Sequence, residues 1–258
     1  MVVVEGPASE VATKVFKNKY LFKLILKHMP IFSLKGSKLT TGWGVGWRDA
    51  FILMLTADSG SRQGTCWSFT RIKHLSTGFI ARFGIRMGKN TSTPNYSVSA
   101  DGMAFVIQNS KYGPGAYQTE SGGAHCGYGG IDNSIAIEFN TYYNQDCNDP
   151  NGNHISLHTN GTQPNSAHHD YSLGHATPSV QMNDYRLHHV ILTYNPHVEG
   201  GGEMSVNFDG ADLLKVKVNI AELLRLENND EAYVGFTAAT GYYHQEHLVH
   251  YCIMHRLT

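Results

Sequence analysis

Residues 135–154 read IAIEFNTYYNQDCNDPNGNH, a stretch that begins as a buried β-strand and continues as a loop of oxygen-bearing side chains. The loop carries carboxylate, amide and imidazole groups around one proline. Oxygen ligands favour Ca²⁺, whereas an imidazole beside carboxylates favours a transition ion such as Mn²⁺ or Zn²⁺. The composition of the loop leaves two interpretations open: a solvated polar turn, or a cradle for a metal ion or a polar ligand.

Beyond residue 31 the sequence predicts an all-β fold. Short β-branched or aromatic runs alternate with Gly, Pro, Asn and Asp, which is typical of strands separated by tight turns. The predicted strands are residues 50–56, 78–87, 102–108, 134–142, 154–160, 187–195, 204–210 and 232–240. Only residues 219–230, NIAELLRLENND, suggest a further helical turn or two. Many short strands without intervening helices predict one sandwich or barrel domain over residues 31–258.

The first thirty residues have a different pattern, which predicts a short N-terminal helical extension. Apolar residues recur at helical spacing between lysines, Ser9 can begin the helix, and Pro30 can end it. A basic amphipathic helix can bind a membrane surface or a partner, and it can equally pack on its own domain or on a sister subunit. We therefore treat residues 1–30 as a separate segment whose role the sequence leaves open.

Composition excludes several classes of protein. A formal net charge of −1 with only 16% charged residues gives no basic face for nucleic acid, and no apolar run is long enough for a membrane span. The four cysteines form no CxxC pair, so they indicate no structural zinc site and permit disulfides without requiring them. The N-terminus lacks the pattern of a signal peptide, so we expect a cytoplasmic or non-classically exported protein, or a secreted one whose leader has been removed.

Several blocks in sequence order resemble the legume-type (L-type) lectin family of the concanavalin A-like superfamily. The blocks are ADGMAFVIQ (100–108), GYGGIDNSIAIEFNTYYNQDCNDPNGNHISLHTNG (127–161), LHHVILTYN (187–195), YVGFTAATG (233–241) and HLVHYCIMH (247–255). The second block is most similar to lectin-like domains of bacteria and simple eukaryotes. The resemblance implies a jelly-roll sandwich of antiparallel sheets that binds a glycan or oligosaccharide without altering it, and that pairs into a homo-oligomer through its back sheet.

The resemblance also implies metal ligands in the loop that follows the strand. The transition-metal ligands are expected to be Glu138, Asn140, Asp149 and His154. The Ca²⁺ ligands are expected to be Asn140, the backbone carbonyl of Tyr142, Asn144 and Asp149. Asn140 departs from the family, which has an aspartate there that bridges both ions. Because a neutral amide removes one charge and one oxygen, we expect one weak Ca²⁺ or none, and no stable pair of Ca²⁺ and Mn²⁺.

A carbohydrate site is implied next to the metal loop. The expected hydrogen-bonding groups are the side chains of Asp101 and Asn144 and the backbone N–H of Gly127, and the peptide bond before Asp101 is expected to be cis. The expected aromatic groups are Tyr142 and, in the specificity loop, Tyr242 and Tyr243. A saccharide offers hydroxyl groups on one side and C–H groups on the other. Carboxylate, amide and aromatic groups therefore suit it.

The sequence predicts a binding protein and not an enzyme. Retaining glycoside hydrolases need two carboxylates about 5–5.5 Å apart, and the strand IAIEFNTYY offers one acid and one amide. The chain also lacks the GxSxG, P-loop and HExxH motifs. Two alternatives stay open: an interaction module on a lectin fold that has lost metal and sugar, and a glucanase-like glycoside hydrolase.

Overall fold

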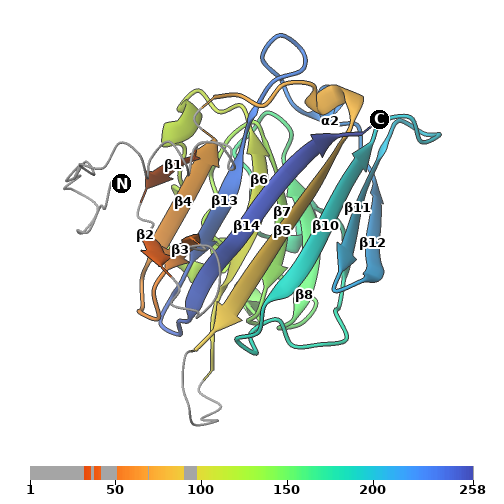
Figure 1. Ribbon diagram of the computed structural model, residues 1–258. Helices are drawn as coiled ribbons and strands as arrows, with labels where there is room; N and C mark the ends of the chain where they lie inside the picture. Colours follow the sequence, from red (N-terminus) through yellow and green to blue (C-terminus); the bar gives the residue numbers. More distant parts are fainter. Residues whose placement is uncertain (1–31, 36–37, 42–50, 69, 90–97, 258) are drawn as a thin grey trace.

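The computed structural model describes residues 32–35, 38–41, 51–68, 70–89 and 98–257 (Figure 1). They form two seven-stranded sheets in which all neighbouring strands are antiparallel. The predicted all-β sandwich is therefore confirmed, while the predicted helical extension over residues 1–30 lies outside the described residues. Within the described part of the chain, no helix is long and apolar enough to cross a membrane.

The two sheets differ in what they carry. The first, which we call the site sheet, has the spatial order β1 (Phe32–Lys35), β4 (Gln63–Ser68), β13 (Tyr233–Ala239), β6 (Gly102–Gln108), β7 (Ser134–Asn140), β8 (His154–Thr159) and β9 (Ser172–Ala176). The second, the back sheet, has the order β12 (Ala211–Lys217), β11 (Glu203–Phe208), β10 (His188–Asn195), β5 (Phe79–Gly88), β14 (Glu246–Arg256), β3 (Phe51–Thr56) and β2 (Lys38–Thr41). A four-residue helix, α2 (Ile220–Leu223), lies within the predicted helical segment.

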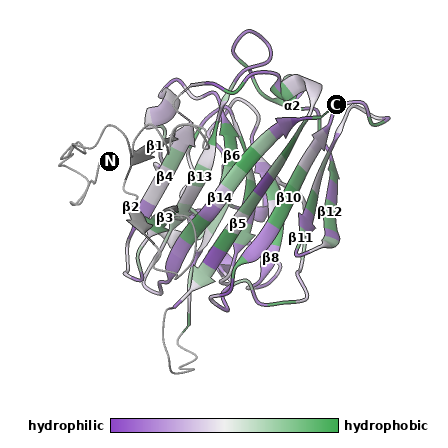
Figure 2. Ribbon diagram, viewed as in Figure 1, coloured by the Kyte–Doolittle hydropathy of each residue, from purple (hydrophilic) through white to green (hydrophobic). Residues whose placement is uncertain are grey.

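Phenylalanine rings pack among aliphatic side chains in the space between the two sheets. The back-sheet strands β5, β10 and β14 carry both hydrophobic and hydrophilic residues along their length (Figure 2). Phe83 of β5 stacks on Phe105 of β6 at 5.3 Å between ring centroids. The same ring meets Phe236 of β13 at 5.2 Å and Phe139 of β7 at 6.0 Å, both edge to face. One back-sheet ring thus contacts three strands of the site sheet, and such ring pairs contribute about 0.5–1.5 kcal/mol each beyond area burial.

The outer face of the site sheet is covered too, by loops. A second apolar cluster lies there, made of Trp67, Ala104, Val106, Ala116, Cys126, Tyr128, Ile131, Ala136 and Ala167. Every residue of β6, β7 and β8 is consequently buried. Because side chains alternate, Phe139 faces the core between the sheets while Glu138 and Asn140 face the covering loops. A charged residue in the middle of an apolar strand is explained by this second, loop-covered face.

The register of the sheet brings the candidate ligands together. Asn140 lies opposite Gly102 on one side and His154 on the other. Glu138 is paired in the same way with Ala104 and Ser156. The last residue of β7 and the first residue of β8 are therefore cross-strand neighbours, and the loop between them closes over their side chains.

Candidate functional site

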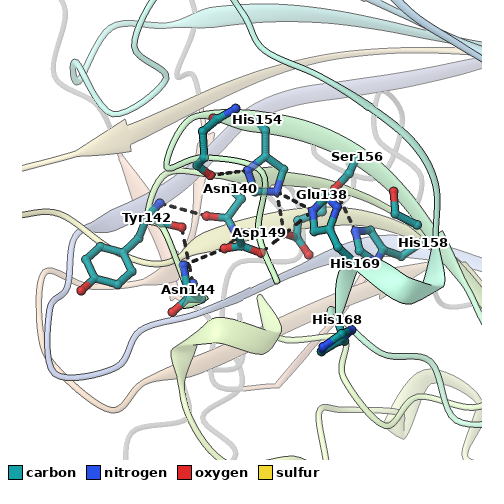
Figure 3. A network of polar contacts seen from close by, with 12 residues as sticks. Glu138, Asn140, Tyr142, Asn144, Asp149, His154, Ser156, His158, His168 and His169 are labelled. Carbon is teal, nitrogen blue, oxygen red and sulfur yellow. Dashed lines mark hydrogen bonds and ion pairs between the residues drawn. The ribbon is translucent and has the colours of Figure 1, made fainter. Parts of the chain in front are cut away.

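Glu138 is the most deeply buried acid of the site, with no exposed side-chain surface (Figure 3). Its Oε2 accepts a hydrogen bond from the Tyr128 hydroxyl at 2.5 Å, and its Oε1 accepts one from Asn140 Nδ2 at 2.9 Å. The Nε2 of His154 lies 3.7 Å from Oε1. Burial raises the pKa of a carboxyl, but the contacts with His154 and Tyr128 outweigh it and lower the pKa of Glu138 to about 2. Glu138 is therefore a fixed negative charge.

The amide of Asn140 connects two carboxylates. Its Nδ2 donates to Glu138 Oε1 and, at 3.3 Å, to Asp149 Oδ2, while its Oδ1 accepts from the backbone N–H of Tyr142 at 2.9 Å. Nδ2 contacts only acceptors and Oδ1 contacts only a donor, so the orientation of the amide group is fixed. A nitrogen that donates to both acids stands where the family's bridging aspartate would hold two cations. The residues present therefore fit the paired metal site poorly.

Asp149 carries the one carboxylate oxygen of the loop that is left unsatisfied. Its Oδ2 accepts from the backbone N–H of Asn144 at 2.8 Å, but its buried Oδ1 has no hydrogen-bond partner among the described residues. Burial, and then the charge of Glu138, raise the pKa of Asp149 to about 7. The free Oδ1 could therefore contact a cation, because no group among the described residues donates a hydrogen bond to it.

Two of the expected calcium oxygens, the Tyr142 carbonyl and Asn140 Oδ1, are engaged within the loop itself. Asn144 Nδ2 lies 3.5 Å from the carbonyl of Tyr142, and Asn140 Oδ1 accepts the N–H of the same tyrosine. The short 3-10 helix η4 (Gln145–Cys147) then turns the chain back towards Asp149. The sequence-based hypothesis of a loop held by its own hydrogen bonds agrees with this arrangement.

Asp101 lies at the neighbouring strand end, just before β6. The Ala100–Asp101 peptide bond is cis, as the resemblance implied. Oδ2 of Asp101 is buried without a hydrogen-bond partner among the described residues. Burial raises the pKa of Asp101 to about 6, against the lowering effects of the Gly241 N–H and the Asn144 side chain. The side chains of Asp101 and Asn144 therefore lie close together.

Gly127 does not join them, because its N–H donates to Oε1 of Gln118 at 2.7 Å and its backbone lies against Ala238. The glycine beside Asp101 is Gly123, where an added Cβ would fall 1.6 Å from Asp101 Oδ2. The structure therefore corrects the choice of glycine. The signal for Gly123 was the Gly-Gly pair that precedes AHCG in the sequence.

Three tyrosines lie near this point. The rings of Tyr142 and Tyr243 are 5.5 Å apart, and Tyr242, which is 90% exposed, meets Tyr243 edge to face at 5.2 Å. The neighbouring His244 forms a 2.6 Å contact with Asp58 Oδ1, which ties this loop to the turn after β3. The structure therefore joins the predicted aromatic residue of the metal loop to the predicted specificity loop.

A histidine that the sequence did not indicate lies beside the candidate metal ligands. His169, from the 3-10 helix η5 (His169–Tyr171), has its Nε2 3.1 Å from His154 Nε2 and 4.0 Å from Asp149 Oδ1. Burial, and then the charges of His158 and His154, lower the pKa of His169 to about 4. Burial lowers the pKa of His154 as well, but Glu138 and Asp149 outweigh it and raise that pKa. The signal for His169 was the histidine-rich run AHHDYSLGH.

Several curated plant proteins are similar to part of this chain. A probable L-type lectin-domain containing receptor kinase S.7 of Arabidopsis thaliana is 29% identical over 173 residues, which are 60% of this chain and 23% of that protein. The L-type lectin-domain containing receptor kinase SIT2 of Oryza sativa subsp. japonica is 30% identical over 169 residues, 59% of this chain and 24% of that protein. The chain thus spans about a quarter of the length of these relatives.

Solved lectin structures share the fold at low identity. The exoplasmic/lumenal domain of VIP36, solved with Ca²⁺ and Man3GlcNAc, has a TM-score of 0.65 at 16% identity, covering 89% of this chain and 84% of that one. Peanut lectin has a TM-score of 0.64 at 18% identity, covering 89% and 93%. Lectin II from Ulex europaeus has a TM-score of 0.63 at 16% identity, covering 86% and 91%. These likenesses confirm the predicted jelly-roll sandwich.

The family model described as the legume lectin beta-barrel domain matches residues 32–251, which include both sheets except the end of β14, and the whole candidate site. The matched domain is a lectin domain, which is a binding module and not a catalytic one, so the prediction of a binding protein and not an enzyme is confirmed for this domain. The chain belongs to the legume-type (L-type) lectin family.

Proposed function

We propose that the chain binds a saccharide where Asp101, Gly123 and Asn144 meet at the end of the site sheet. The observation that carries the proposal is the buried Oδ2 of Asp101, which has no hydrogen-bond partner among the described residues. Buried polar atoms are normally satisfied, and sugar hydroxyls are donors that suit a carboxylate oxygen. Gly123 lies directly against that oxygen, where any side chain would collide with it.

The aromatic side of the site supports the same proposal. Tyr142 and Tyr243 lie 5.5 Å apart at an angle of 40°, so they offer ring faces next to the hydrogen-bonding groups. A pyranose ring has apolar C–H groups that pack on such faces while its hydroxyls reach Asp101 and Asn144. Tyr242, on the exposed side of Tyr243, is positioned to contact a second sugar unit of an oligosaccharide.

We further infer that saccharide binding here tolerates the loss of Ca²⁺. The relative VIP36 was solved with Ca²⁺ and mannose sugars, and also in a metal-free form. In this chain the hydrogen bonds of Asn140 to Glu138, Asp149 and Tyr142 connect the parts of the loop that a bridging ion would hold. A Ca²⁺ ion, bound weakly or not at all, is then not needed to keep Asn144 near Asp101.

Titration calorimetry on metal-free protein, after a glycan array has identified a ligand, tests the proposal. Asp101→Asn keeps the shape of the side chain but removes its charge and one acceptor, so we expect binding to weaken about 100-fold, since hydrogen bonds to charged groups contribute about 1.5–3 kcal/mol each. Asp146→Asn, in the exposed part of the metal loop, is the matched control and should bind normally. Added Ca²⁺ should change the affinity little.

Failure of the folded wild-type chain to bind any glycan would refute the proposal. It would favour the alternative of an interaction module that uses the lectin fold without sugar. The predicted pairing through the back sheet stays a prediction, which sedimentation of the full chain can check.

A further inference from the structure

Three side chains that could share one ion meet beside the loop that follows β7: Asp149, His154 and His169 (Figure 3). We propose that they bind a single transition-metal ion of the zinc type, with His169 as a ligand from outside the family's metal-loop motif. Such a site would bind its ion whether or not the chain binds a saccharide. It would also differ from the paired Ca²⁺ and Mn²⁺ site that the resemblance implied.

The spacing of the three ligand atoms suits one small ion. His154 Nε2 and His169 Nε2 are 3.1 Å apart, and His169 Nε2 lies 4.0 Å from Asp149 Oδ1. All three atoms lie within 4.8 Å of one another. Ligand atoms around a tetrahedral Zn²⁺ are about 3.3 Å apart, given bonds of about 2.0–2.1 Å. A small inward movement of Asp149 would complete the geometry.

The ring of His154 is already turned for metal binding. Its Nδ1 lies 2.8 Å from the carbonyl oxygen of Asn151, an acceptor only, so Nδ1 carries a hydrogen and donates it. Metal-binding histidines commonly donate their second N–H in this way, which fixes the tautomer and aims the other nitrogen at the ion. The other ring nitrogen, Nε2, then lies towards His169 and Glu138.

His169 is held in place by a buried anchor at the start of its loop. Asn165 is fully buried, and its Nδ2 lies within hydrogen-bond distance of Ser134 Oγ at 3.1 Å and of the carbonyl of His158 at 3.3 Å. The backbone of Asn165 also donates to Ile131 and accepts from Gly130. Four residues later the ring of His169, only 8% exposed, meets the ring of His154 edge to face at 4.9 Å.

The other nearby imidazoles are less suitable ligands. The two nitrogens of His158 face Ser156 Oγ at 2.9 Å and the Ser166 carbonyl at 3.2 Å. His175 is exposed, and its ring centroid lies 5.4 Å from that of His169. The fourth coordination position is therefore left to Glu138 Oε1, which lies 3.7 Å from His154 Nε2, or to water.

The oxygen that completes the set is the unsatisfied one. Oδ1 of Asp149 belongs to a side chain that is 1% exposed, and it has no hydrogen-bond partner among the described residues. Its nearest basic group is His169 Nε2. A buried carboxylate oxygen without a partner is costly, and a bound cation would satisfy it. This observation is independent of the spacing of the histidines and points to the same place.

Ligand chemistry selects the ion. Two imidazole nitrogens with one carboxylate favour Zn²⁺ over Ca²⁺, which prefers six to eight oxygens, and over Mn²⁺, which lies lowest in the usual order of affinities. Asn140 removes the competing arrangement, because its amide donates to both Glu138 and Asp149. The same substitution that weakens the paired site therefore leaves an imidazole-rich one.

The competing explanation is a shared proton. Two ring nitrogens 3.1 Å apart need something between their lone pairs, and an N–H on His169 directed at His154 would serve. The two explanations differ in their response to zinc. A proton-bridged pair is complete without metal, whereas a ligand set takes up one ion and releases that proton.

Zinc titration of the metal-free full chain, against a chromophoric zinc indicator, separates them. We expect one equivalent of Zn²⁺ to bind more tightly than Mn²⁺ or Ca²⁺, and His169→Gln to weaken binding at least about 100-fold, since even outer-shell changes cost 10–100-fold. His168→Gln is the matched control from the same loop and should bind as the wild type does. Circular dichroism and thermal unfolding verify that each variant is folded.

X-ray absorption spectroscopy of the zinc-loaded wild-type protein provides a readout that needs no variant. X-ray absorption at the zinc edge should count two imidazole ligands on the bound ion. No one-equivalent binding, unchanged affinity in folded His169→Gln, or fewer than two imidazoles would each overturn the proposal. Saccharide affinity measured on the same metal-free samples reports on the other proposal separately.

Discussion

Restoring the family's aspartate at position 140 is the sharpest test of how the metal loop is held. Asn140 is fully buried and donates to Glu138 Oε1 at 2.9 Å and to Asp149 Oδ2 at 3.3 Å. Asn140→Asp replaces this donor by a third carboxylate between the other two. Without a cation, the variant therefore loses both hydrogen bonds and gains repulsion between like charges.

The magnitude follows from those two contacts. Hydrogen bonds to charged groups contribute about 1.5–3 kcal/mol each, so the loss is about 3–6 kcal/mol before repulsion is counted. That is a large share of the roughly 5–15 kcal/mol by which a domain is stable. At about 2–4 °C per kcal/mol for a domain of this size, the melting temperature of the metal-free variant should fall by about 10 °C or more.

Thermal unfolding with and without Ca²⁺ is the assay. The variant should recover about 2.7 kcal/mol when Ca²⁺ is present at 100 times its dissociation constant, whereas the wild type should gain little. Asn148→Asp adds the same charge at an exposed position of the same loop and should leave the melting temperature nearly unchanged. A metal-free Asn140→Asp protein as stable as the wild type, or equal stabilisation of both by Ca²⁺, would refute the reasoning.

Four further expectations concern the sugar side and the core. Burial raises the pKa of Asp101 to about 6, so the acceptor is protonated at lower pH and saccharide affinity should fall as the pH drops below about 6. Calorimetry from pH 5 to 8 checks this, and an affinity that does not change with pH would contradict it. The same shift means that the folded state holds this proton more tightly than the unfolded chain, so the stability contributed by Asp101 declines as pH rises from about 4 to about 6. Gly123→Ala should abolish saccharide binding because its Cβ would fall 1.6 Å from Asp101 Oδ2, while Gly115→Ala, with open space around it, should bind normally in the same assay. Phe83→Ala should lower the free energy of unfolding by about 3–5 kcal/mol in denaturant titrations, and a loss below 1 kcal/mol would contradict the packing described here.

The strands that could be predicted are those buried by their own side chains. Residues 102–108 were predicted with the bounds of β6, and β7 ends two residues before its predicted end because the chain turns at Thr141 to cover Asn140. β4, QGTCWS, carries no apolar alternation, and it is buried because its glycine lets the backbone approach β3. An added Cβ on Gly64 would lie 1.9 Å from the Leu55 carbonyl oxygen. This close approach depends on the partner strand, so the sequence of β4 alone does not predict the strand.

The candidate site likewise contains residues that the sequence could predict and residues that it could not. Spacing along one strand and one loop was enough to bring Glu138, Asn140, Asp149 and His154 together, since cross-strand register follows from a short connection. His169 is 15 residues beyond His154, and its position depends on the burial of Asn165 under a separate loop. Gly127 and Gly123 are indistinguishable as glycines in the sequence; only the contact with Gln118 and the closeness to Asp101 separate them.

Asn140 and His169 both affect the balance between the buried carboxylates of the metal loop and the cations that they can hold. With an aspartate at position 140, three buried carboxylates would lie together, and the family resemblance implies a pair of dications between them. With Asn140 the buried carboxylates of the metal loop are those of Glu138 and Asp149, and the amide already joins them. One dication then balances both acids, and the neutral ring of His169 adds a ligand without adding charge. One dication at Asp149, His154 and His169 would offset the carboxylates of Glu138 and Asp149, whereas the two dications of the paired arrangement would exceed them in a buried place.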